Sequence, residues 1–462
     1  MCIILLSSGA SIGSLRTYKT MEGGTRLRSD STSWGCAMQA IKSPMHMVYA
    51  LCLYGSIARR NNSCLGGQSV MMLAIGIVTA ILWGVLIRNI VKSLRCLRRL
   101  SDISPLAPQD PHPRVSIVIP ARNEEEHIDN TIQRVLSLDY PNLECIVVDD
   151  RSVDQTGLRL DEWARKDSRL KVQHLTTSDP DWIGVNYALY RGASVATGEW
   201  LLFLDADVFL SAQALSKGLH YAMTQNLDHV TVFRATAFYG TNRIVRAFVL
   251  YLLFQYYAFG SPWKVRDPQS PVYMGDSAFN LIRRAAYEAF GGHQAIRGFL
   301  DDDYKLGLCV KSQGFRQDVL VSGGEVAVPW YASLGAMVEG LGRVLLGTLE
   351  YNLNRQMIVA PIMLTFWLWP FIGVMFSHGL TQFLYLALSV VCLGTFFGLT
   401  VSQDIYNPFY IIVFPVLPIL WAYMMERSAI VARRHGGVRW RSQYYSLEFL
   451  RQYLVMHRSS LK

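Results

Sequence analysis

The sequence predicts an α/β domain with a mostly parallel sheet, set between helices that cross a membrane. Between residues 115 and 207, apolar runs that suit buried strands alternate with segments of helical spacing, which indicates βαβ units. Charged residues make up only 17% of the 462-residue chain, whereas soluble domains have roughly 25%. Part of the chain is therefore expected to lie in lipid.

The expected elements follow from local pattern. A continuous apolar run such as VSIVIPA is typical of a parallel strand that is buried on both faces. Acidic residues in the first turn and apolar side chains at helical spacing indicate the helices between the strands. The strands are expected at 115–121, 143–150, 170–175 and 200–207, and the helices at 125–138, 154–167 and 184–196.

Four apolar runs are long enough to span a bilayer. The first, 70–87, is followed by basic residues, and because positive charges stay inside, the α/β domain is expected to be cytoplasmic. The others, 357–376, 383–400 and 408–425, precede a basic tail. Three crossings after the domain would place this tail outside, against the same rule. One run is therefore expected to be re-entrant or split.

The bulk composition narrows the class of partner. The net charge of +9 could indicate nucleic acid, but the basic residues flank apolar runs and suit anionic lipid headgroups, so no nucleic-acid partner is expected. The eight cysteines include no Cys-x-x-Cys pair and favour neither a disulfide framework nor a zinc site.

In chain order we expect a poorly ordered leader (1–69), a transmembrane helix (70–91), a basic linker (92–113), the α/β domain (114–350), about three transmembrane or re-entrant helices (351–426) and a basic tail (427–462).

Carboxylates follow two of the expected strands. Asp149 and Asp150 end the second, and Asp205 and Asp207 end the fourth. Ligands of open parallel sheets bind at the carboxyl ends of the strands. Clustered carboxylates repel one another unless a cation offsets their charge. Mg²⁺ or Mn²⁺, bound through one or two of these carboxylates and a substrate phosphate, would do so. The alternative is a set of solvated turn residues.

A third acidic run, Asp301 to Asp303, has two interpretations that spacing alone does not separate. One carboxylate could act as the base that removes a proton from an acceptor hydroxyl. Equally, the run could be the acidic start of a helix, stabilised by the helix dipole.

The ordered motifs resemble a known family. They are IVIPARNEEEHI, IVVDDRSVDQTG, DWIGVNYALYRGASVATGEWLLFLDADV, GDSAFNLIRRAAYEAFGGHQAIRGFLDDDYKLG and VPWYASLGAMVEGLGR. Over roughly residues 112 to 355 the chain resembles family 2 of the glycosyltransferases, which have the GT-A fold. It is most similar to the membrane-bound bacterial branch of hopanoid-associated, carotenoid and ceramide glycosyltransferases.

The resemblance implies a role for each matching residue. On the donor side it implies a nucleotide-binding loop at Pro120, Ala121, Asn123 and Glu124, and an acid that contacts the base or ribose at Asp150 with Asp149. It implies a motif for metal and diphosphate at Asp205 and Asp207. It also implies a catalytic base at Asp303, with Asp302 before it, and an acceptor side shaped by Gly291, Gly292 and His293. Because the family inverts the anomeric carbon, a single displacement is implied. His293 could also be structural, and Trp330 and Tyr331 either line an acceptor channel or pack.

Three positions depart from the branch. Val185 stands where a lysine is frequent, Pro329 where an arginine is common, and Gly436 where the Gln-x-x-Arg-Trp motif of processive synthases has glutamine. The last departure argues against a polymerase. The first leaves one phosphate or acceptor contact in doubt.

The function expected from this resemblance is transfer of a sugar from a UDP- or GDP-sugar to a lipid-type acceptor at the cytoplasmic membrane face. Mg²⁺ or Mn²⁺ is the expected cofactor, and a multi-pass protein of the plasma membrane, the inner membrane of a bacterium, is the expected setting. Two alternatives stay open. One is a polyprenyl-phosphate glycosyltransferase that feeds cell-envelope assembly, and the other is a catalytically silent, nucleotide-binding membrane scaffold.

Overall fold

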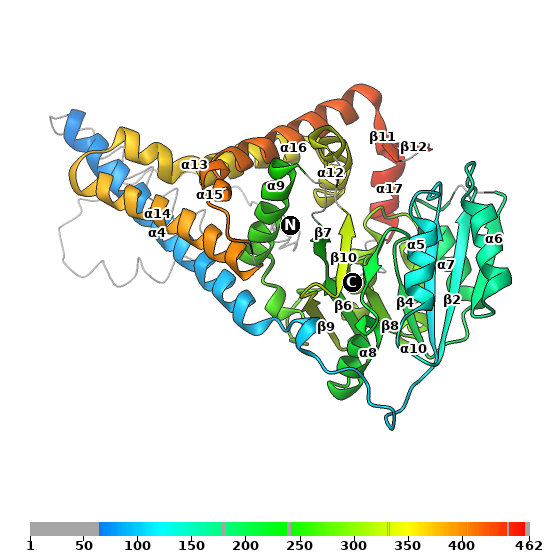
Figure 1. The fold of residues 1–462 in the computed structure, drawn as a ribbon. Coiled ribbons are helices and arrows are strands. Elements are labelled where there is room, and N and C mark those ends of the chain that lie inside the picture. The colour runs from blue at the N-terminus through cyan, green and yellow to red at the C-terminus, as the bar shows by residue number, and fades with distance from the viewer. Residues whose placement is uncertain are drawn as a thin grey trace, which may run out of the picture.

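The structure is a computed structural model that describes residues 64–177, 179, 181–237, 242–329, 331, 333–403, 405–440 and 443–457. Most of the expected leader and Trp330 lie outside these residues. Figure 1 shows two parts: an α/β domain and a set of long helices that extends away from one edge of it.

A seven-stranded sheet forms the centre of the α/β domain, in the order β3-β2-β1-β4-β8-β6-β9. All neighbouring strands are parallel except at β8, which runs antiparallel to β4 and β6. Its strands are β1 (Val115–Ala121), β2 (Leu143–Asp150), β3 (Leu170–Leu175), β4 (Trp200–Phe203), β6 (His229–Phe233), β8 (Asn280–Arg283) and β9 (Gln317–Val321). The predicted mostly parallel sheet is confirmed, and the first three strands have the predicted bounds.

The fourth strand is shorter than predicted. It ends at Phe203, and the chain then leaves the sheet because the backbone N–H of Asp205 donates to the carbonyl of Ser277, 3.0 Å away. Asp205 and Asp207 therefore lie in a loop just beyond the strand. A second sheet joins β5 (Phe209–Leu210), β10 (Val326–Pro329) and β7 (Ala235–Ala237) beside this loop.

Helices cover both faces of the main sheet, and two apolar clusters form the core. One lies between β1, β2 and β4 and the helices α5 and α8, and the other lies against α7, α10 and α11. The helices are α5 (Ile128–Leu136), α6 (Thr156–Lys166), α7 (Asn186–Val195), α8 (Ala214–Thr224), α10 (Arg284–Ala289) and α11 (Asp302–Ser312), with short 3₁₀ segments at Leu100–Asp102, Pro262–Lys264 and Gly292–Ile296.

Within the residues that the structure describes, three helices are long and apolar enough to cross a membrane: α4 (Cys64–Cys96), α13 (Leu353–Phe376) and α14 (Gly379–Ser402). The third apolar run of the C-terminal part is divided into α15 (Phe409–Val413) and α16 (Val416–His435), and neither is among the candidate spans. Charged side chains such as Glu426 and Arg427 lie within α16. Whether a run is re-entrant in a membrane stays a prediction.

The apolar segment after Asn242 belongs to the core of the helical part. It forms α9 (Arg243–Gln255) and a π-helical turn at Tyr256–Gly260. Phe248, Tyr251 and Phe254 are fully buried; Tyr251 and Phe254 pack on Trp367 of α13, and Phe254 also packs on Phe396 of α14. Of the two interpretations that its composition allows, a helix on the lipid surface or a packed core helix, the structure has the second.

The last elements return to the α/β domain. They are the hairpin of β11 (Gly437–Trp440) and β12 (Gln443–Ser446), and α17 (Leu447–His457), whereas α12 (Leu334–Thr348) lies between β10 and α13 and packs against α16. Figure 1 shows the hairpin and α17 at the end of α16, beside the α/β domain. The ring of Tyr453 on α17 lies so close to Gly298 that a Cβ there would come within 2.1 Å of it.

Candidate active site

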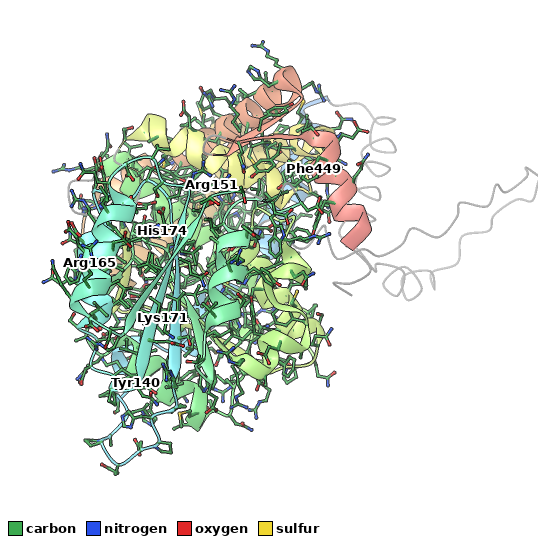
Figure 2. The ribbon with its side chains drawn as sticks, turned by 90° about the vertical axis from the view of Figure 1, so that its right-hand side faces the viewer. Tyr140, Arg151, Arg165, Lys171, His174 and Phe449 are labelled. Atoms are coloured by element: carbon green, nitrogen blue, oxygen red, sulfur yellow. The ribbon has the colours of Figure 1, made fainter. Side chains whose placement is uncertain are left out.

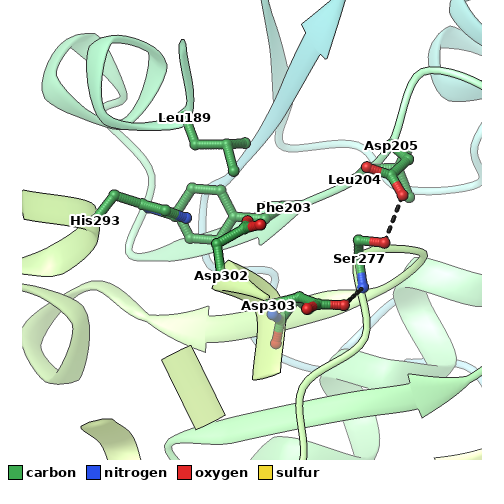
Figure 3. Close-up of a pocket in the computed structure, with 9 residues that line it drawn as sticks. Leu189, Phe203, Leu204, Asp205, Ser277, His293, Asp302 and Asp303 are labelled. Atoms are coloured by element: carbon green, nitrogen blue, oxygen red, sulfur yellow. Dashed lines mark hydrogen bonds between the residues drawn. The ribbon is translucent and has the colours of Figure 1, made fainter. Parts of the chain in front are cut away.

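The loop after β4 and the start of α11 meet at one serine. The hydroxyl of Ser277 donates to Asp205 Oδ2 over 2.5 Å, and its backbone N–H donates to Asp303 Oδ2 over 3.0 Å. Figure 3 shows both hydrogen bonds, with the two carboxylates on either side of Ser277. Two acidic motifs almost a hundred residues apart in the sequence are thereby held in one place.

The segment that carries Ser277 is packed backbone to backbone against α11. A Cβ on Gly275 would lie 1.8 Å from the carbonyl oxygen of Asp303, and one on Gly307 would lie 2.1 Å from that of Met274. Only glycine permits this approach at the two positions. The position of Asp303 relative to Ser277 is therefore fixed by the main chain.

A single arginine lies among these acids. Arg234 follows β6, and its Nη1 is 3.5 Å from Asp276 Oδ1 and 3.4 Å from the hydroxyl of Ser277. Its charge also acts on Asp205 and Asp303. One guanidinium thus offsets part of the negative charge, and the remainder is available to attract a cation.

Burial and mutual repulsion alter the protonation of the acids. Burial, followed by the charge of Asp207, raises the pKa of Asp205 to about 7. Burial and the charge of Asp303 raise the pKa of Asp302 well above its usual range. Burial and then Asp276 also raise the pKa of Asp303, but Arg234 opposes this shift. In the Asp302–Asp303 pair, Asp303 is therefore the member that ionises more readily.

A small cavity joins these groups to the acceptor-side segment. Its lining includes Asp205, Ser277, Asp302, Asp303 and His293, and Figure 3 shows Asp302 between His293 and the other acids. Four of the residues predicted from sequence are thus brought together.

His293 is held as a neutral ring. Its backbone N–H donates to the hydroxyl of Tyr287 over 3.0 Å, and that hydroxyl lies 2.8 Å from Nδ1. The ring packs edge-on against Phe203, and burial lowers its pKa to about 3. Gly291 and Gly292 both have positive φ, and Gly292 lies against the ring of Tyr287. The Gly-Gly-His segment therefore shapes one wall of the cavity.

The nucleotide-binding loop predicted after β1 lies beside the end of β2. Asn123 has a φ of 54°, and its side-chain oxygen accepts a hydrogen bond from the N–H of Val153. The N–H of Glu124 donates to the hydroxyl of Thr156 over 2.8 Å. Pro120 and Ala121 are the last residues of β1 and pair with β2. The two loops are thus tied together at the carboxyl edge of the sheet.

The two acids that end β2 face different partners. Asp149 accepts a hydrogen bond from the N–H of Ser152 and is 2.8 Å from His174 Nδ1, so its carboxylate is engaged within the fold. Both carboxylate oxygens of Asp150 accept hydrogen bonds from the guanidinium of Arg151, at 2.7 and 3.2 Å, and Asp150 Oδ2 lies 3.6 Å from Arg122 Nη1. Figure 2 shows Arg151 at the end of the sheet opposite Tyr140.

The remaining predicted residues lie apart from the cavity lining. Tyr331 packs against α12, where a Cβ on Gly340 would lie 2.3 Å from its hydroxyl. Val185 immediately precedes α7. Asp207 acts electrostatically on Asp205 but does not line the cavity.

Sequence reasoning missed Ser277, Arg234 and the arginine pair around Asp150. Ser277 belongs to the Gly-Asp-Ser triplet of a motif that resembles the family, and no role was predicted for this serine. Arg151 directly follows the Asp-Asp pair, so its proximity could have been predicted. Nothing in the local pattern near Arg234 indicates that it faces the acids.

The chain is similar in sequence to known proteins. Residues 116–291 match the model of glycosyl transferase family 2. A 4,4'-diaponeurosporenoate glycosyltransferase of Staphylococcus haemolyticus is 41% identical over 99 residues, which cover 21% of this chain and 25% of that protein. The protein of the same name from Staphylococcus aureus is 24% identical over 347 residues, 73% of this chain and 89% of that protein.

A solved mannosyltransferase from Pyrobaculum calidifontis, in complex with GDP-Man and Mn²⁺, has a TM-score of 0.45 and 16% identity, covering 79% of this chain and 99% of that chain. The matched residues 116–291 run from β1 to the Gly-Gly-His segment and include both Asp motifs of the strands. The chain therefore carries a domain of glycosyl transferase family 2, and the family match together with the mostly parallel sheet confirms the predicted GT-A fold.

Proposed function

We propose that the protein is an inverting glycosyltransferase that moves a sugar from a nucleotide-sugar donor to a lipid-type acceptor at the cytoplasmic membrane face. The observation that carries this proposal is the convergence of Asp205 and Asp303 on Ser277. Ser277 therefore donates hydrogen bonds to both Asp205, which can hold a diphosphate through a cation, and Asp303, which can act as a base. Such a pair is what a single displacement at an anomeric carbon requires.

Asp303 is the proposed base. Its two oxygens accept hydrogen bonds from the backbone N–H groups of Ser277 and Tyr304, at 3.0 and 2.7 Å, which fix the carboxylate and leave lone pairs free. The acceptor O–H gives its proton to this carboxylate as its oxygen bonds to the anomeric carbon. The bond from that carbon to the diphosphate breaks in the same step.

The acids after β4 fit a divalent cation. Among the described residues no group of three or more His, Cys, Asp or Glu could hold a metal alone. This suits Mg²⁺ or Mn²⁺ in transferases, which bind one or two carboxylates and complete their shell with substrate phosphates and water. Asp205 and Asp207 would supply those carboxylates. Burial is the main cause of the raised pKa of Asp205, and the charge of Asp207, the second cause, is one that a cation would offset. The cation would stabilise negative charge on the leaving diphosphate.

A lipid-type acceptor is supported by the candidate spans. The helices α4, α13 and α14 are long and apolar enough to cross a bilayer, and the helical part packs directly on β9 through Val319. A lipid hydroxyl at the bilayer surface is thus within the reach of the domain. The staphylococcal relatives are named 4,4'-diaponeurosporenoate glycosyltransferases, and an acceptor of that kind, although a carboxylate, is likewise of the lipid type.

Donor cleavage tests the proposal. The purified full chain in detergent is incubated with UDP- and GDP-sugars, membrane lipid extract and either Mn²⁺ or EDTA, and released nucleotide is measured. We expect release from one donor, its loss in EDTA, and a fall of at least about a hundredfold in Asp207→Asn. Asp139→Asn, an exposed aspartate in the loop before β2, is the matched control and should keep full activity. Release that survives in Asp207→Asn would contradict the metal assignment.

Substituting Asp303, the proposed base, tests which class of acceptor the protein uses. A lipid hydroxyl must lose a proton, so Asp303→Asn should abolish transfer to it, whereas a polyprenyl phosphate is already ionised and needs no base. Transfer to polyprenyl phosphate that persists in Asp303→Asn would support the cell-envelope alternative. Nucleotide binding without release from any donor would support the silent scaffold.

A further inference from the structure

The segment after the last long helix is folded into the α/β domain. Helix α16 ends at His435, the next residue Gly436 has a φ of 67°, and the N–H of Leu447 donates to the carbonyl of Gly436 to close the β11–β12 hairpin. An apolar cluster then joins Val438 and Tyr445 of this hairpin to Ile183 of the loop before α7. The hairpin is thus packed against a loop at the carboxyl edge of the sheet.

Tyr445 connects the hairpin to this edge through a hydrogen bond. It is 8% exposed, and its hydroxyl accepts a hydrogen bond from the N–H of Gly184 over 3.3 Å. The same hydroxyl donates to Gln443 Oε1 over 2.6 Å. A phenolic oxygen has two lone pairs, so one of them remains available after these two bonds.

The groups around that oxygen are those of the nucleotide end of the site. The hydroxyl of Tyr445 interacts electrostatically with Arg151, Arg122 and Asp150. These residues follow β1 and β2, and the two guanidinium groups leave an excess of positive charge over the one carboxylate. Arginine pairs of this kind suit phosphate oxygens, and an acceptor oxygen beside a carboxylate suits a ribose hydroxyl.

We propose that Tyr445 is a donor-binding residue, and that the β11–β12 hairpin completes the pocket for the nucleoside diphosphate part of the donor. The free lone pair of the Tyr445 hydroxyl oxygen accepts a hydrogen bond from a ribose hydroxyl, next to Asp150. Arg122 and Arg151 hold the phosphates. The inference rests on the proposed function, because it needs a nucleotide donor at the carboxyl ends of β1 and β2.

Nucleotide affinity tests this inference. The full chain in detergent with Mn²⁺ is titrated with UDP and with GDP by calorimetry, and the variants Tyr445→Phe and Tyr444→Phe are compared. Losing one neutral hydrogen bond should weaken binding by about three- to tenfold in Tyr445→Phe. The donor KM should rise by the same factor while kcat stays within about twofold. Tyr444→Phe is the matched control, because the hydroxyl of Tyr444 donates to the carbonyl of His435, the last residue of α16.

The outcomes separate this inference from the function on which it rests. If the unaltered chain binds a nucleotide and Tyr445→Phe binds it as tightly as Tyr444→Phe does, the inference is wrong and the proposed function stands. If the unaltered chain binds neither nucleotide, both are overturned. Tyr445→Phe keeps the ring that packs in the apolar cluster, so its melting temperature should match that of the control variant and exclude unfolding as the cause.

Discussion

Substituting alanine for Gly275 should uncouple the two acids of the site. A Cβ at this position would lie 1.8 Å from the carbonyl oxygen of Asp303, whereas ordinary contacts begin near 3.4 Å. The backbone of α11 and that of the Ser277 segment must therefore separate by about 1.6 Å. A misplacement of about 1 Å at a reacting group can cost a hundredfold in rate. We expect transfer to fall by at least about a hundredfold in Gly275→Ala.

The same substitution should leave nucleotide binding intact, because Asp150 and its arginines belong to different loops. Single-turnover transfer and UDP or GDP titration on the same preparation measure the two effects. Gly335→Ala is the control: a Cβ there has its nearest neighbour at 3.9 Å, near the start of α12. Crowding at Gly275 should also cost about 1–3 kcal/mol of stability. Unchanged transfer in Gly275→Ala would refute the view that main-chain contact fixes Asp303.

Two further substitutions separate catalysis from stability. Asp303→Asn should lower transfer by about 10²- to 10⁴-fold with unchanged nucleotide affinity; transfer at the rate of the unaltered chain would exclude Asp303 as the base. Burial alone would raise the pKa of Glu144, but hydrogen bonds from Lys171, Ser116 and Thr197 outweigh it and lower the pKa from 4.5 to about 2. This carboxylate therefore stabilises the fold above pH 4.5, and its contribution is lost as the pH falls through 2. At about 1.4 kcal/mol per pKa unit, Glu144→Gln should cost about 3 kcal/mol at pH 7 and less at pH 3, measured by denaturant unfolding; an equal cost at both values would contradict the charge argument.

Sequence alone predicted the bounds of the first three strands. The runs at β1 and β2 are buried throughout, whereas β3 is an edge strand with the sequence LKVQHL that is buried only at its two ends. The run after Trp200 is just as apolar, yet the strand stops at Phe203. Its end is set by a hydrogen bond from Asp205 to Ser277, 72 residues further along the chain. No local pattern contains that partner.

For the same reason, sequence alone predicted only part of the candidate site. Asp150, Asp205 and Asp303 carry charge at the ends of strands or the start of a helix, where periodicity and composition make acids conspicuous. Ser277 and Arg234 are ordinary in their local context, and their importance comes only from what tertiary packing brings to them. The two interpretations of Asp303, a helix start and a base, are also compatible, because it lies in the first turn of α11 and faces Ser277.

The C-terminal contact also bears on membrane topology. The hydrogen bond between Gly184 and Tyr445 requires the α/β domain and the segment after α16 to lie on the same side of a bilayer. With α4 as a span before the domain and α13 and α14 as spans after it, the chain would cross twice between the domain and this segment and would return to the starting side. A further crossing by α15 and α16 would separate the two partners. The packing of the hairpin, the number of candidate spans and the basic residues at the end of α16 therefore all favour the same arrangement, with the tail beside the donor pocket.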